Sequence, residues 1–86
     1  MELADTKDMM ISADYKERFR AEYAQLKIRT TKLTVMLNAY SAGTLDITPA
    51  CPIDVLVAQK KQMNAYLTTL EMRAAMEQIE LGDLQC

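Results

Sequence analysis

The residues best suited to chemistry lie in residues 12–42, where basic side chains outnumber acidic ones. The basic residues of this segment are Lys16, Arg18, Arg20, Lys27, Arg29 and Lys32. Helical spacing places Lys16, Arg20 and Lys27 on one side, with Tyr15 beside them. Arginine forks onto phosphate oxygens and tyrosine offers a stacking face, so the pattern is typical of a site for a small anionic nucleotide. We expect ligand contacts from Tyr15, Lys16, Arg20, Lys27 and Arg29.

The same charges also fit a solvated helix face that pairs with an acidic partner helix, which is the commoner arrangement. Residues 52–86 supply such a partner, because their acidic residues outnumber their basic ones. Tyr23 and Tyr40 fall on a hydrophobic seam, so we assign both to the core. Tyr15, at the start of the segment, is the freer candidate.

The composition argues against catalysis and against a metal or cofactor. The chain has 86 residues, no histidine, two cysteines and two glycines. Structural zinc sites take four nitrogen or sulfur ligands, and acid–base catalysis most often uses histidine. A glycine-rich phosphate loop cannot be built from two separated glycines. We therefore expect a protein that is not an enzyme and needs no cofactor.

Residues 12–42 are predicted to form one helix. Its apolar positions are spaced by alternating steps of four and three, interrupted by one threonine: Phe19, Tyr23, Leu26, Thr30, Leu33, Leu37 and Tyr40. This spacing is a heptad seam. Ser12 is the expected N-cap, Asp14 belongs to the first turn, and Gly43 supplies the left-handed residue that ends the helix.

Residues 52–81 are predicted to form the second helix. Its seam is Ile53, Leu56, Lys60, Met63, Leu67, Leu70, Ala74, Glu77 and Leu81. We interpret its two charged members, Lys60 and Glu77, as register-setting or snorkelling side chains. Gly82 is the expected terminating glycine. Residues 43–51 form the loop, residues 82–86 a tail, and residues 1–11 an N-terminal helix or arm.

The loop sequence TPACPID, residues 48–54, contains both prolines and one cysteine. Pro52 is predicted at the first helical position, where its missing N–H costs nothing. Cys51 then falls at the N-cap, where a thiol pKa can be lowered, although no base lies next to it in sequence. We interpret the stretch as the start signal of the second helix.

These elements predict a single all-α domain, an antiparallel helical hairpin, that assembles into a homo-oligomeric bundle. Each helix has apolar residues beside its seam that one partner helix cannot cover: Ile28, Val35, Met36, Val55, Ala58, Ala65, Met72, Met76 and Ile79. Exposed apolar stripes of this kind mark interfaces. The alternative is a three-helix monomer in which residues 1–11 fold over the hairpin.

The N-terminal residues lack the pattern of a signal peptide, and no apolar run approaches the ~20 residues that span a bilayer. The net charge is −2, which provides no general attraction for nucleic acid polymers. We therefore expect a cytoplasmic protein without a membrane or nucleic acid polymer as partner.

Two stretches, SADYKERFRAEYAQLKIRTTKLTVML and CPIDVLVAQKKQMNAYLTTLEMRA, resemble a family of small helical phage and prophage proteins named after a crAss-like phage member. Its members are similar to the pattern YKERLKAEYxQLxxRxxKL, a cysteine–proline loop, and a second helix of the form LLxxQLxxMxxYxxxLExRA. The resemblance covers residues 12 to about 81 and implies a phage origin.

A weaker resemblance links the chain to phage anti-CBASS sponges, which are small hairpins assembled as hexamers that sequester cyclic oligonucleotides. Tyr15-Lys16 resembles the Tyr-Arg pair of that family, and Lys27 resembles its ligand-binding lysine. Here the spacing is three residues shorter, and the second helix lacks the tryptophan of that family. The resemblance implies that Tyr15, Lys16 and Lys27 contact the ligand, and that the oligomer is a hexamer.

Three functions follow from this combination of features. The first is a counter-defence sponge in the host bacterial cytoplasm that holds a small nucleotide immune signal without converting it. The second is an interaction module that inhibits a host defence or nuclease protein through an exposed helix face. The third is a structural phage protein without a ligand.

Overall fold

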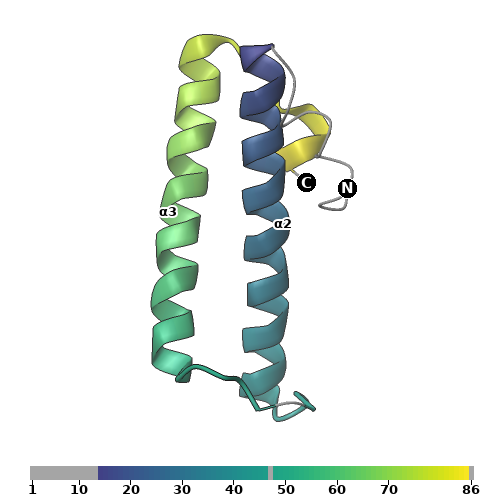
Figure 1. Cartoon of the computed structure of the whole chain (residues 1–86), viewed down its shortest axis with the longest axis vertical. Coiled ribbons are helices and arrows are strands. Elements are labelled where there is room, and N and C mark those ends of the chain that lie inside the picture. Colours follow the sequence, from purple (N-terminus) through teal and green to yellow (C-terminus); the bar gives the residue numbers. More distant parts are fainter. Residues whose placement is uncertain (1–13, 47, 86) are drawn as a thin grey trace.

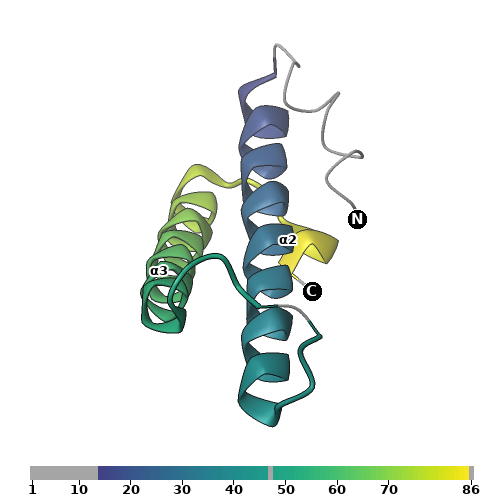
Figure 2. The ribbon, with the colours of Figure 1, turned by 60° about the horizontal axis from the view of Figure 1, so that its bottom comes forward.

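The computed structural model describes residues 14–46 and 48–85. Two long antiparallel helices, α2 (Tyr15–Ala42) and α3 (Ile53–Glu77), are followed by a short 3-10 helix, η2 (Gly82–Gln85). Figures 1 and 2 show that α3 and η2 lie against different sides of α2, which makes α2 the central element. The predicted all-α hairpin is confirmed, and there is no strand in either described range. The arm expected over residues 1–11 lies outside the described residues.

The helix α2 begins three residues later than predicted, because Asp14 rather than Ser12 caps it. Asp14 has extended backbone angles, and its carboxylate accepts hydrogen bonds from the backbone N–H groups of Lys16, at 2.9 Å, and Glu17, at 3.4 Å. Aspartate at this position satisfies N–H groups that have no partner within the helix. The cap places Tyr15 at the first helical position. Ser12 lies outside the described residues.

The C-terminus of α2 agrees with the prediction. Gly43 adopts φ +74°, a left-handed conformation that costs glycine little. Its N–H donates to the carbonyl of Tyr40, and the N–H of Thr44 donates to the carbonyl of Ala39. This pair of bonds is a Schellman motif, which satisfies two of the last carbonyls of the helix.

The boundaries of α3 differ from the prediction at both ends. At the start, Pro52 is the capping residue and Ile53 the first helical one, so Cys51 lies one position before the cap. At the end, the helix stops at Glu77 and Gln78 takes φ 58°, four residues before Gly82. This early stop lets Ile79 and Leu81 turn back into the core, where both are buried.

The burial of these two residues explains why a non-glycine residue ends α3. The N–H of Ile79 donates to the carbonyl of Ala74 at 2.8 Å, again as in a Schellman motif. Both residues belong to the same core cluster, which supplies the apolar contact that accompanies this motif. The left-handed conformation costs Gln78 about 1–2 kcal/mol. Burying two large aliphatic side chains contributes about 1.5–3 kcal/mol for each of them.

The core lies mainly at the end of the hairpin where α2 begins and α3 ends. The buried cluster consists of Phe19, Tyr23, Leu67, Leu70, Ala74, Ile79 and Leu81. Tyr23 is fully buried, and its hydroxyl donates to Glu71 at 2.5 Å. Thr30, the polar break in the first seam, is buried and donates to the carbonyl of Leu26. The predicted core position of Tyr40 is wrong, because its side chain is 48% exposed near the loop end.

Candidate functional site

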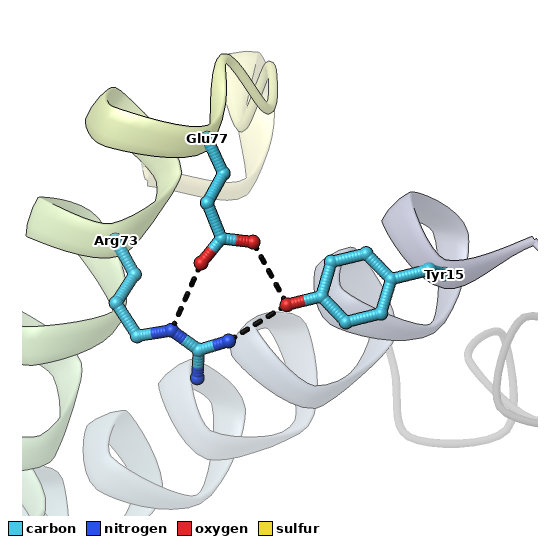
Figure 3. A network of polar contacts seen from close by, with 3 residues as sticks. All are labelled: Tyr15, Arg73 and Glu77. Carbon is cyan, nitrogen blue, oxygen red and sulfur yellow. Dashed lines mark hydrogen bonds and ion pairs between the residues drawn. The ribbon is translucent and has the colours of Figure 1, made fainter.

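A ring of hydrogen bonds joins the first residue of α2 to the last turn of α3 (Figure 3). The Tyr15 hydroxyl donates to Glu77 Oε1 at 2.8 Å and accepts from Arg73 Nη2 at 2.7 Å. Arg73 Nε donates to Glu77 Oε2 at 3.1 Å. This bond closes the ring, and it is also an ion pair between residues one helical turn apart. All three groups remain open to solvent, so a dissolved molecule can reach them.

Aromatic side chains lie close to the three hydrogen-bonded residues. The Arg73 guanidinium lies over the Phe19 ring, 5.0 Å from its centroid, within the range of a cation–π contact. The Tyr15 and Phe19 centroids are 6.3 Å apart, and the ring planes are tilted by 51°. Two turns further into the hairpin, the Tyr66 hydroxyl donates to a carboxylate oxygen of Glu22. The arrangement therefore presents the Arg73 cation next to the exposed ring of Tyr15.

These residues line a groove of about 330 Å³, formed by Tyr15, Arg18, Phe19, Glu22 and Arg73. We refer to it as the Tyr15–Arg73 groove. It combines two guanidinium groups, two aromatic rings and one carboxylate. A larger hollow of about 410 Å³ lies beyond the end of α3, but its charged lining residues are the acidic Glu71 and Glu80. An anionic ligand is therefore better matched by the Tyr15–Arg73 groove.

The pKa values in the ring reflect its hydrogen bonds. The hydroxyl of Tyr15 lowers the pKa of Glu77 by donating to its carboxylate, and Arg73 lowers it further. The same hydrogen bond to Glu77 raises the pKa of Tyr15. Glu77 also raises the pKa of Arg73 by accepting from its guanidinium. A carboxylate in the last turn of a helix is disfavoured by the helix dipole, so Tyr15 and Arg73 compensate for an unfavourable position.

The lowered pKa of Glu77 predicts a pH-dependent contribution to stability. Because the folded-state pKa lies below the unfolded value of about 4.5, Glu77 stabilises the fold above that value, and its contribution disappears as the pH falls through the folded-state pKa. The Glu77→Gln variant should therefore melt slightly below the wild type at pH 7, and this gap should be smaller at pH 3. Thermal unfolding followed by circular dichroism across this range tests the expectation, and an equal gap at both pH values would contradict it.

The structure distributes the predicted ligand residues over different parts of the hairpin. Tyr15 lines the Tyr15–Arg73 groove. Lys27 lines a separate hollow of about 220 Å³, together with Thr30, Thr31, Thr34, Val35, Asn64 and Leu67. Lys16, Arg20 and Arg29 line neither of these two hollows. Lys27 follows Tyr15 by twelve residues, which places it ~18 Å along the helix and ~120° around it. One protomer therefore does not gather these five residues into one site.

Arg73 and Glu77 belong to the candidate site, although sequence reasoning did not select them. Two signals were present: the residues are spaced by four on one helix, and Glu77 interrupts the apolar seam. We interpreted Glu77 as a register-setting or snorkelling residue, whereas the structure shows it bound to Tyr15 of the other helix.

Cys51 is exposed and has a free thiol.

Within residues 14–46 and 48–85, no group of three or more histidine, cysteine, aspartate or glutamate residues could hold a metal ion. No helix in these ranges is long and apolar enough to cross a membrane.

Comparison with known proteins yields one family. A family model described as Sequestin matches residues 13–76, a region that includes α2, the loop and nearly all of α3. No curated protein and no solved structure matches the chain. The matched region contains Tyr15 and Arg73 and ends one residue before Glu77.

Proposed function

Since the chain belongs to the Sequestin family, we propose that it binds and sequesters a small anionic nucleotide, and that it does so without converting it. The family name describes a sequestering role. The observation that carries the ligand class is the Tyr15–Arg73 groove, where an exposed guanidinium is held next to aromatic rings. Guanidinium forks match phosphate oxygens, and exposed rings stack on bases.

The groove offers a partner for each part of a nucleotide. Arg18 and Arg73 suit the phosphate, the exposed Tyr15 ring suits the base, and the Glu22 carboxylate suits a ribose hydroxyl. We propose that Lys16, Arg20, Lys27 and Arg29 contribute positive potential or complete the site from neighbouring copies. Binding without turnover agrees with a chain that contains no histidine, the residue that most often serves as general acid or base.

The biological role that fits this chemistry is counter-defence by a phage in the bacterial cytoplasm. A protein that holds an immune nucleotide lowers its free concentration and so prevents an effector from responding. Sequestration of this kind requires affinity and abundance rather than catalysis.

A melting experiment with a panel of cyclic dinucleotides and trinucleotides tests the proposed function. A ligand that binds only the folded state raises the melting temperature, by an amount equivalent to about 2.7 kcal/mol when its concentration is a hundred times Kd. We expect one or more members of the panel to give this shift, and mass spectrometry to recover the nucleotide intact. Hydrolysis of the nucleotide, or no shift with any member, would refute the proposal.

Two tyrosines on α2 provide a matched pair of variants for the same experiment. Tyr15 and Tyr40 are 47% and 48% exposed at opposite ends of the helix. Tyr15→Ala should remove the shift, whereas Tyr40→Ala should retain it. Both variants should keep the helical circular dichroism spectrum of the wild type.

We also propose that the working form is a homo-oligomer that pairs through α3. Besides the seam packed on α2, α3 carries a second heptad series in which every member is exposed: Val55, Ala58, Gln62, Ala65, Thr69, Met72 and Met76. Met76 is 73% exposed. None of the six charged residues of α3 belongs to this second seam. Interface cores are likewise depleted of charge, and a second copy of the chain offers the same neutral stripe.

A further inference from the structure

The Nε and Nη2 atoms of Arg73 form one edge of its guanidinium, and two oxygens occupy that edge. Glu77 Oε2 accepts from Nε at 3.1 Å, and the Tyr15 hydroxyl accepts from Nη2 at 2.7 Å. Figure 3 shows the two oxygens side by side, supplied by different helices. A phosphate group would present two oxygens to the same edge in a bidentate contact. The carboxylate and the hydroxyl together therefore imitate a phosphate.

Separating the Glu77 carboxylate from the Arg73 guanidinium costs little free energy. The Arg73 and Glu77 side chains are 43% and 36% exposed, and exposed ion pairs of this kind contribute little to stability. Glu77 is the last residue of α3, so its side chain can rotate into water without disturbing the helix. The Arg73 guanidinium would keep its position during this exchange, because it also lies on the Phe19 ring.

We propose that Arg73 is the phosphate-binding residue of the Tyr15–Arg73 groove, and that Glu77 is a displaceable stand-in for the ligand phosphate. This inference rests on the proposed function, since it assigns the anion contact of the same site. A ligand binds only if its anionic group competes successfully with a tethered carboxylate. Glu77 thereby sets a threshold that admits phosphates and rejects neutral or weakly charged molecules.

Calorimetric titration with inorganic pyrophosphate tests the assignment. The Glu77→Gln variant loses the competing carboxylate, so it should bind pyrophosphate about two- to five-fold more tightly than the wild type, the range expected from the strength of an exposed ion pair. The Arg73→Gln variant should lose binding. The Arg73→Lys variant should also bind weakly, because lysine keeps the charge but not the fork.

Glu80→Gln is the matched control. Glu80 is an exposed carboxylate three residues beyond Glu77, and its replacement changes the net charge by the same amount. If Glu77→Gln and Glu80→Gln gained the same affinity for pyrophosphate, the change in net charge alone would explain the effect, and the inference would be overturned. Unchanged binding in Arg73→Gln, or no binding by any variant, would overturn it as well.

The two proposals fail in different experiments. If the wild type binds no member of the nucleotide panel while the pyrophosphate series behaves as expected, the proposed function fails and the anion site stands. If nucleotides bind to the wild type and equally well to Arg73→Gln, the proposed function stands and Arg73 is not its phosphate contact.

Discussion

Replacing Leu70 by alanine is expected to lower the free energy of unfolding by about 2–5 kcal/mol. Leu70 has no exposed surface and lies in the buried cluster that joins α2, α3 and the segment after α3. The cost combines the lost burial of the side chain with the cavity that remains. A chain of 86 residues has a total stability of about 4–13 kcal/mol, so the variant should be largely unfolded or unfold at low urea. Urea titration followed by circular dichroism measures the difference.

The control for this variant is Val57→Ala, on the same helix. Val57 is 38% exposed and belongs to neither seam of α3. Its replacement should change the free energy of unfolding by less than about 0.5 kcal/mol, as is usual for surface positions. A loss below 1 kcal/mol in Leu70→Ala, or equal losses in both variants, would show that the hairpin is not held together at this end.

The helices themselves could be predicted because their signals are local. The seam of α2 repeats in steps of three and four, and Gly43 marks its end in the sequence and in the structure. The start of α2 was misplaced because Ser12 and Asp14 are both good capping residues. The structure selects the aspartate, and two capping residues so close together cannot be ranked from the sequence.

The end of α3 could not be predicted, because it depends on contacts distant in the sequence. Gly82 is the local termination signal, yet the chain turns at Gln78, which has no special preference for the left-handed conformation. The turn is stabilised by burying Ile79 and Leu81 in the core cluster. A pattern within one helix contains no information about such burial.

In the candidate site, too, the local features could be predicted and the contacts between the helices could not. Tyr15 could be selected from α2 alone, because it is an exposed aromatic residue near basic ones. Its connection to Arg73 and Glu77 depends on which turns of the two helices face each other. The i, i+4 spacing of Arg73 and Glu77 places them on one face of α3, but only the packed hairpin places the Tyr15 hydroxyl against both residues.

The second large effect concerns assembly, and it follows from the order of side chains along the exposed seam of α3. If two copies of α3 pair antiparallel about a twofold axis at Ala65, Val55 faces Met76 and Ala58 faces Met72 of the other copy. Gln62 then faces Thr69, and Ala65 faces itself. Val55 and Ala58 oppose the longer methionines, and the polar pair of Gln62 and Thr69 sets the register. Size-exclusion chromatography with light scattering should therefore give a mass above the 9.7 kDa of one chain.

Ala65→Lys should reduce the measured mass to that of one chain, because it places two ammonium groups in contact across the axis. Ala75→Lys is the control, since Ala75 is also an exposed alanine of α3 but lies outside the second seam. It should leave the assembly intact. Because Ala65 faces itself in this pairing, mixing Ala65→Lys with Ala65→Glu should restore an assembly that neither variant forms alone. A wild type that elutes as a single chain, or a mixture that stays monomeric, would exclude pairing about this axis.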